Sequence, residues 1–196
     1  DVYLNNAIDS MDTLASSLIV NVNRVHSQGS SLEGVESLTG STRITNTAVN
    51  LVNAGFEQVP VNGTLYLTAY NESTGAYQEE AFDIDPTLDS VDGLITEINA
   101  AFSGTIRLSL TDSNQLSFET DTGYKIYFNE GSTRNGDSSD FLLACGVNTF
   151  FTGNSAYSIE VKQVIQNDVN LIAAGCSLSP GDNTNALALA DLENQT

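Results

Sequence analysis

The chain opens with a regular row of apolar side chains that predicts a long helix. The row alternates spacings of four and three residues, as in a heptad repeat. Its members are Leu4, Ile8, Met11, Ala15, Leu18, Val22 and Val25. The helix is expected from Val2 to His26, about 37 Å at 1.5 Å per residue, and to end before Gly29. Because a lone helix is marginal in water, the row is expected to pack against other helices in a rod.

A second helix is expected near the other end of the sequence. Pro180 opens a turn in which the side chain of Asp182 or Asn183 can cap a helix. The residues from Ala186 to Leu192 then favour helix. Neither terminal helix carries a capping or stop signal at its outer end, so we expect both to continue in a longer protein.

Between these helices the pattern changes to short strands. Alternation predicts a hairpin of Thr64–Tyr70 and Tyr77–Ile84, with a five-residue loop at Asn71–Gly75. Asp85 and Pro86 then predict the start of a helix that stops at Gly104. The further elements expected are strands at 106–110, 116–118 and 126–128, a short helix at 139–145 and a strand at 159–161.

Connections of hairpin length favour antiparallel sheet, so the fold class predicted is α+β. We expect an antiparallel β-rich domain with a packed helix, inserted between two long helices of a helical-bundle rod domain. The divisions predicted are a rod domain of residues 1–28 and 180–196, a connecting segment with a short helix at 29–57, an inserted domain at 58–165 and a return linker at 166–179.

The composition excludes several classes of partner. A formal net charge of -19 repels nucleic acid and anionic membrane surfaces, so neither is expected as a partner. No apolar run approaches the roughly 18 to 20 residues of a membrane span. The two cysteines, Cys145 and Cys176, are too few for a disulfide framework. A bond between them stays open, with free thiols favoured.

No catalytic, cofactor or metal site is expected. His26 lies at the end of the first helix, where a cation favours the helix dipole, and no nucleophile motif accompanies it. A calcium loop starting in the acidic cluster would need Gly and Glu where Leu88 and Leu94 stand. The acidic cluster consists of Asp83, Asp85, Asp89 and Asp92. We interpret these carboxylates as helix caps, and the chain is not expected to be an enzyme.

Several stretches of the chain together resemble one family. The strongest is Phe141-Leu-Leu-Ala-Cys-Gly-Val-Asn-Thr-Phe-Phe-Thr-Gly153, continued by Ser155-Ala-Tyr-Ser-Ile-Glu-Val161. The others are Leu14-Ala-Ser-Ser-Leu18, Asn21-Val-Asn-Arg-Val-His26, Asn167-Asp-Val-Asn-Leu-Ile-Ala-Ala-Gly175 and Pro180-Gly-Asp-Asn-Thr-Asn-Ala-Leu-Ala-Leu-Ala190. They resemble the flagellar hook-associated protein 1 family, the first of the two proteins that join hook to filament. In addition, Thr87 to Ala101 is similar to a motif of the inserted domains of flagellin-like proteins.

The resemblance implies an extracellular structural subunit of the bacterial flagellum, exported by the flagellar type III pathway. Its implied partners are the hook protein, the second junction protein and further copies of itself in a ring. Because the polymerising segments of the family are expected to lie outside this sequence, the chain alone is expected to be a monomer. The residues that carry the family motif are Gly146, Asn148, Phe150, Phe151 and Gly153.

The two cysteines depart from that family, whose axial members usually avoid cysteine. Two groups of alternatives stay open. One is a sister axial protein, namely the second junction protein, the filament cap or flagellin. The other is a surface adhesin whose inserted domain binds glycans or a host protein.

Overall fold

The computed structural model describes residues 2–129, 136–179 and 181–194. The fold is α+β, as predicted, with antiparallel sheets, a packed helix and a long first helix. In chain order, the elements are α1 (Val2–Ser27), β1 (Ser37–Thr39), η1 (Leu51–Asn53), β2 (Gly63–Asn71), β3 (Tyr77–Ile84), α2 (Val91–Phe102), β4 (Ile106–Leu110), β5 (Leu116–Thr120), β6 (Tyr124–Tyr127), α3 (Phe141–Cys145), β7 (Phe151–Thr152), β8 (Glu160–Val161), α4 (Gln163–Asn167), η2 (Val169–Leu171), α5 (Thr184–Ala190) and η3 (Asp191–Asn194).

Two three-stranded antiparallel sheets form the β-rich domain, in the orders β3-β2-β6 and β1-β5-β4. Just before β1, Val35 exchanges two backbone hydrogen bonds with Ile126 of β6, at 3.0 and 2.7 Å. The two sheets are therefore joined through one chain segment. Their inner faces share one apolar core, in which Leu65 opposes Phe82 and Leu108 opposes Phe118 across the strands.

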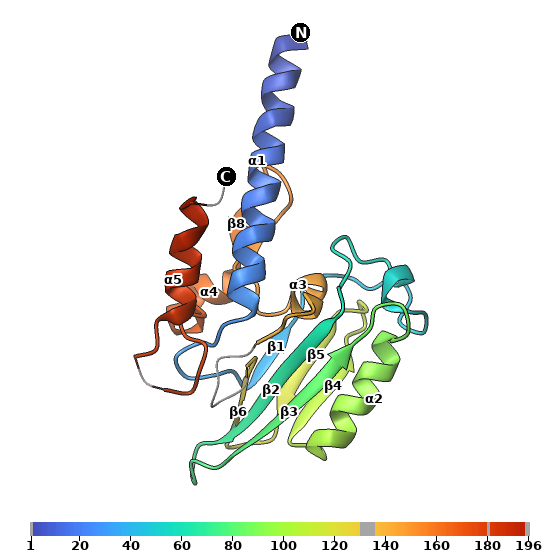
Figure 1. The fold of residues 1–196 in the computed structure, drawn as a ribbon, viewed down its shortest axis with the longest axis vertical. Helices are drawn as coiled ribbons and strands as arrows, with labels where there is room; N and C mark the ends of the chain where they lie inside the picture. The colour runs from blue at the N-terminus through green and yellow to red at the C-terminus, as the bar shows by residue number, and fades with distance from the viewer. Residues whose placement is uncertain (1, 130–135, 180, 195–196) are drawn as a thin grey trace.

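Helix α2 packs against both edges that this arrangement leaves, β3 and β4 (Figure 1). The Asn99 amide donates to Leu108 O at 2.9 Å and accepts from Leu108 N at 2.7 Å, so this side chain pairs with the β4 backbone as a neighbouring strand would. Near the end of α2, Gln78 of β3 donates to Ala101 O. The helix thereby covers backbone groups that would otherwise be open edges.

The long helix α1 projects away from the β-rich domain, and α5 lies beside the half nearer the domain (Figure 1). The end of α1 meets the start of α5, since Ser30 pairs with Gly175 and Ala174 O accepts from Ala186 N. The two helices are therefore antiparallel, and the start of α1 and the end of α5 lie on the same side of the domain (Figure 1). Within the described residues α5 is short, at seven residues, where a long helix was predicted.

The N-terminal turn of α5 is built from side-chain acceptors. Asp182 Oδ1 accepts from both Thr184 N and Thr184 Oγ1, while its Oδ2 accepts from Cys176 N and Ser177 Oγ. The N-cap of α5 is Asn183, whose side chain makes no capping hydrogen bond, so the predicted side-chain cap is not formed and Asp182 instead closes the turn before the helix. The predicted turn residue Pro180 lies outside the described residues.

Helix α2 begins later than Asp85 and Pro86 predicted. Its N-cap is Ser90, whose Oγ accepts from Gly93 N at 3.1 Å. Asp85 instead closes a separate turn, accepting from both Thr87 N and Thr87 Oγ1. Leu88, which would lie in the first turn of a helix starting at Asp85 and Pro86, is 79% exposed on that separate turn. Asp85 and Ser90, five residues apart, are both of a cap-forming type, and the helix that begins after Ser90 buries Val91.

Residues 29–57 are more than the connecting segment that was predicted. Val35, Ile44, Leu51 and Phe56 all belong to the buried core, and Leu51 is fully buried in the short helix η1. The strand β1 also lies in this segment and completes a sheet by pairing with β5. The β-rich domain therefore begins before residue 58.

Candidate functional site: the junction between the long helix and the β-rich domain

The helix α1 meets the rest of the chain through a face different from the predicted row. Within the described chain the buried residues of α1 are Ala15, Ile19, Asn23, His26 and Ser27, and the first four are spaced by four, four and three residues. Of the predicted row only Ala15 is buried, and Val22 and Val25 are half-buried. The exposed members, at 47 to 63% exposure, are Leu4, Ile8, Met11 and Leu18. Burial on α1 therefore includes polar side chains that an apolar pattern leaves out.

Asn23 is the central contact between α1 and the motif segment, residues 146–153. Its Oδ1 accepts from Phe150 N at 2.9 Å and from Phe151 N at 2.7 Å, and its Nδ2 donates to Phe151 O at 3.0 Å. Only 7% of Asn23 is exposed. The side-chain amide thus satisfies three backbone groups that would otherwise be unpaired against the helix.

A second side-chain amide, that of Asn148, caps the C-terminal end of α1. The backbone of Asn148 is left-handed, with φ of 51°, and its Nδ2 lies 2.9 Å from Gly29 O and 3.3 Å from both His26 O and Ser27 O. The last carbonyls of a helix lack partners within the helix. Asn148 supplies one, so a residue distant in sequence ends α1 and fixes it to the motif segment.

His26 is buried in the same place, at 1% exposure. Its Nε2 accepts from Ala173 N at 3.0 Å, which leaves the proton on Nδ1, and Nδ1–H donates to Asn148 O at 2.7 Å. Burial lowers the pKa of His26 below its usual 6.5, against the hydrogen bond to Asn148, and the nearby Lys162 charge lowers it further. The imidazole is therefore a neutral bridge, where a helix-terminal cation was expected.

Lys162 reaches into the junction from the end of β8. Its Nζ donates to Gly146 O at 2.5 Å, and burial lowers its pKa from 10.5 to about 8. Gly146, with φ of 66°, closes α3, so the ammonium lies at the carbonyl end of that short helix. Cys145, the last residue of α3, is a buried free thiol and is not joined to Cys176.

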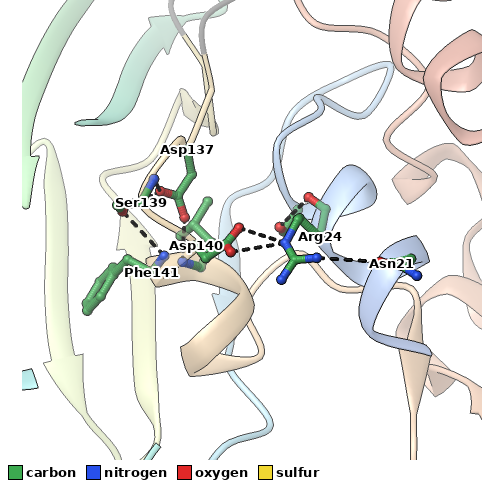
Figure 2. Close-up of polar contacts among 8 residues, drawn as sticks. Asn21, Arg24, Asp137, Ser139, Asp140 and Phe141 are labelled. Carbon is green, nitrogen blue, oxygen red and sulfur yellow. Dashed lines mark hydrogen bonds and ion pairs between the residues drawn. The ribbon is translucent and has the colours of Figure 1, made fainter. Parts of the chain in front are cut away.

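An ion pair ties α1 to the beginning of α3 (Figure 2). Arg24 Nε lies 3.2 Å from Asp140 Oδ1 and 3.0 Å from Asp140 Oδ2. Behind it, the buried Asp137 accepts from Ser139 N, Ser139 Oγ and Leu142 N. Burial raises the pKa of Asp137. Asp137 and Ser139 hold the start of α3 in place, so that the Asp140 carboxylate faces Arg24 of α1 (Figure 2).

The motif segment ends in a tight turn that returns to α1. Gly153 has φ of 87°, and a Cβ there would lie 2.1 Å from Ser158 O, so only glycine fits. Farther round the turn, Ala156 N donates to Asp12 Oδ1 at 2.9 Å. The motif segment therefore contacts α1 near Asn23, and the turn that follows the segment contacts α1 near Asp12.

All five residues of the family motif lie in or next to this junction. Gly146 and Gly153 bound the segment, Asn148 caps α1, and the Phe150 ring packs against His26 and Phe151 at centroid distances of 5.4 and 4.9 Å. The contact residues that the sequence interpretation missed include Asn23, Lys162 and Asn185. For Asn23 a signal existed, because it continues the spacing of Ala15 and Ile19 toward His26.

In the junction, the segments are held together by amide and carbonyl groups and by one ion pair, that of Arg24 with Asp140.

Over residues 2–129, 136–179 and 181–194, no group of three or more His, Cys, Asp or Glu side chains could hold a metal ion. No helix in the same ranges is both long and apolar enough to cross a membrane. A pocket of about 370 Å³ beside α1 is lined by residues that include Ile19, Asn23, Arg43, Glu57 and Phe151.

Comparison with known proteins gives little overlap. No model of a known protein family matches the chain, and no curated protein matches it. Among solved structures, the D2-D3 domains of the flagellar cap protein FliD from Serratia marcescens are similar at a TM-score of 0.32 and 15% identity. The likeness covers 58% of this chain and 53% of that chain. A TM-score this low establishes neither a shared fold nor a shared function.

Proposed function

We propose that the chain is a structural subunit of the bacterial flagellum that forms the junction between hook and filament, without catalytic activity. The observation that carries the proposal is the position of the family motif. Asn148, Phe150 and Phe151, on which the resemblance to hook-associated protein 1 depends most, are the residues that hold α1 on the β-rich domain. The motif thus has a mechanical role at the joint of the two parts.

The junction is suited to carrying load between a rod and a projecting domain. Asn23 and Asn148 make three contacts each to backbone groups, and Arg24 adds an ion pair with Asp140. Hydrogen bonds are directional, so they fix the angle of α1 as well as its position. A purely apolar contact would resist separation but would allow sliding.

The exposed apolar row on α1 has a role in the same proposal. Leu4, Ile8, Met11 and Leu18 would pack against other helices once the subunit is assembled in its ring, with hook protein and the second junction protein as neighbours. The protein would then be extracellular, and it would reach this place through the flagellar type III pathway.

Deletion of the parent gene, followed by electron microscopy of the cells, tests the proposal. The expected result is cells with complete hooks and no filaments that shed flagellin into the medium. Complementation with the intact gene should restore filaments, and an Asn23→Leu gene should restore them poorly. Normal filaments on the deletion strain would overturn the proposal.

The same deletion strain distinguishes the proposed function from the alternative functions. A filament cap or a second junction protein would leave subunits of the first junction protein on isolated hooks, which immunoblotting of purified hooks detects. An adhesin would leave filaments normal and lower attachment to glycan or matrix surfaces. Because residues 29–57 are part of the domain core, binding assays should use the whole chain.

A further inference from the structure

The side chain of His26 joins α1 to the motif segment and to the return segment, which in turn bonds to α5. Its Nδ1–H donates to Asn148 O in the motif segment, and its Nε2 accepts from Ala173 N in the return segment. Ala173 O in turn accepts from Asn185 Nδ2 at the start of α5, at 2.7 Å. A continuous hydrogen-bonded path therefore links α1, the motif segment, the return segment and α5.

This path requires a neutral imidazole. Protonation of Nε2 would turn an acceptor into a donor that faces the Ala173 N–H, and that bond would be lost. Ala173 is fully buried and His26 almost so, which leaves no space at this contact for water to replace the bond. The proton would disconnect α1 from the return segment.

The charges around His26 oppose its protonation. Lys162, from the end of β8, is the charged group acting on the imidazole among the described residues, and it is a cation. On α1 itself, Arg24 pairs with Asp140 at the start of α3. On the α5 side, Asp182 is held by donors of its own loop. No carboxylate of these elements pairs with the ring to stabilise an imidazolium.

We propose that His26 is an acid-sensitive latch, whose protonation releases the return segment and α5 from α1 while the β-rich domain stays folded. The domain is expected to survive because, among the described residues, its core cluster takes no member from α1 or α5. The latch acts whatever role the chain has in the cell, so its test is independent of the flagellar proposal.

The direction of the pH dependence follows from linkage. Because the pKa of His26 is lowered on folding, the unfolded or released state takes up the proton more readily. The contribution of the latch to stability is therefore complete above pH 6.5 and is lost as the pH falls below that value. Below the lowered pKa of the closed state no further loss is expected.

Amide hydrogen exchange of the whole 196-residue chain, measured by NMR at pH 7.5 and pH 5.5 and corrected for intrinsic rates, tests the latch. Protection of the Ala173 amide should fall about tenfold at the lower pH, the scale of one lost buried hydrogen bond. Protection of the Leu67 amide, in the central strand β2, should stay unchanged. The control is His26→Gln, which offers one donor and one acceptor without a titrating group, and whose Ala173 protection should not depend on pH.

An equal fall in the wild type and in His26→Gln would overturn the proposal, as would no fall in the wild type. A direct titration covers the case in which His26→Gln fails to fold. The ¹⁵N shifts of the wild-type His26 ring should titrate below pH 6.5, with the Ala173 amide moving at the same midpoint. A midpoint at or above 6.5, or an Ala173 amide that does not follow the ring, contradicts the latch.

Discussion

The two halves of α1 have opposite chemistry and opposite surroundings. Toward its start the helix presents large apolar side chains to solvent, such as Tyr3 at 88% and Met11 at 63% exposure. Toward its end it buries polar ones, with Asn23 at 7% and His26 at 1%. One end of the helix thus exposes large apolar side chains, while the other end buries polar ones.

The difference in side-chain polarity between the two halves indicates which groups each half of α1 contacts. The buried half faces the motif segment, whose backbone N–H and C=O groups need partners, so amide and imidazole side chains fit there better than apolar ones. The exposed half faces no other segment of the described chain along most of its length, and its apolar row suits a contact made elsewhere. Four changes, taken from the largest expected effect to the smallest, test this contrast.

Asn23→Leu should destabilise the chain most. The variant keeps the size of the side chain but leaves Phe150 N, Phe151 N and Phe151 O without partners, and at about 1 to 3 kcal/mol for each orphaned group the cost is about 4 kcal/mol. Urea unfolding measures it. The matched control is Asn21→Ala on the exposed side of α1, expected within about 0.5 kcal/mol. Equal effects of the two changes would refute the special role of Asn23.

Lys162→Met should stabilise the chain, because a charge that faces the junction is removed from a largely buried position. A pKa lowered from 10.5 to about 8 corresponds to about 3 kcal/mol at about 1.4 kcal/mol per unit, from which loss of the bond to Gly146 O subtracts. Since the pKa is lowered on folding, wild-type stability should gain a rising contribution between pH 8 and 10.5 that the variant lacks. Unfolding curves at pH 7, 8 and 10 check this. Parallel pH profiles in both proteins would argue against it.

Asn148→Gly should cost about 2 kcal/mol. Glycine keeps the left-handed backbone but loses the side-chain contacts to the last carbonyls of α1. Asn148→Ala loses the same contacts and adds about 1 kcal/mol of backbone strain. Thermal unfolding of the two variants separates the cap from the backbone conformation, and an alanine variant as stable as the glycine one would contradict the strain.

Leu18→Asp and Ile8→Asp should change the stability of the isolated chain by less than about 0.5 kcal/mol each, because both side chains are about half exposed. If the apolar row packed within this chain, each substitution would instead lower the free energy of unfolding by several kcal/mol. Differential scanning calorimetry of the two variants, with Ile19→Asp on the buried face as the destabilised reference, makes the comparison. If the two variants melted at temperatures as low as that of Ile19→Asp, the apolar row would have to pack within this chain.

Local patterns predicted much of the fold. The alternation around Leu65 and Leu67 gave the hairpin of β2 and β3, with its five-residue loop, and the apolar run before Gly146 gave the helix α3 and its end. These elements combine strong periodicity with a turn or cap that acts over a few residues. The last residue of α1 also differs by only one from the prediction, although the cap at that end comes from the distant Asn148.

Features that depend on distant residues could not be predicted. Strand β1 exists because Ser37–Thr39 pairs with β5, 78 or more residues away in sequence, and its Gly- and Ser-rich surroundings carry no strand pattern. The buried face of α1 was missed for a similar reason. An apolar pattern cannot show that Asn23 and His26 meet backbone groups of residues 148–173, and only the assembled fold supplies their partners.

Hydrogen exchange along α1 of the isolated chain tests the contrast between its two halves most directly. The account predicts slow exchange of the amides from Ile19 to His26, which are held by the junction, and fast exchange of those before Met11, where few contacts oppose local fraying. Uniformly slow exchange along the whole helix, including the turns around Leu4 and Ile8, would contradict it.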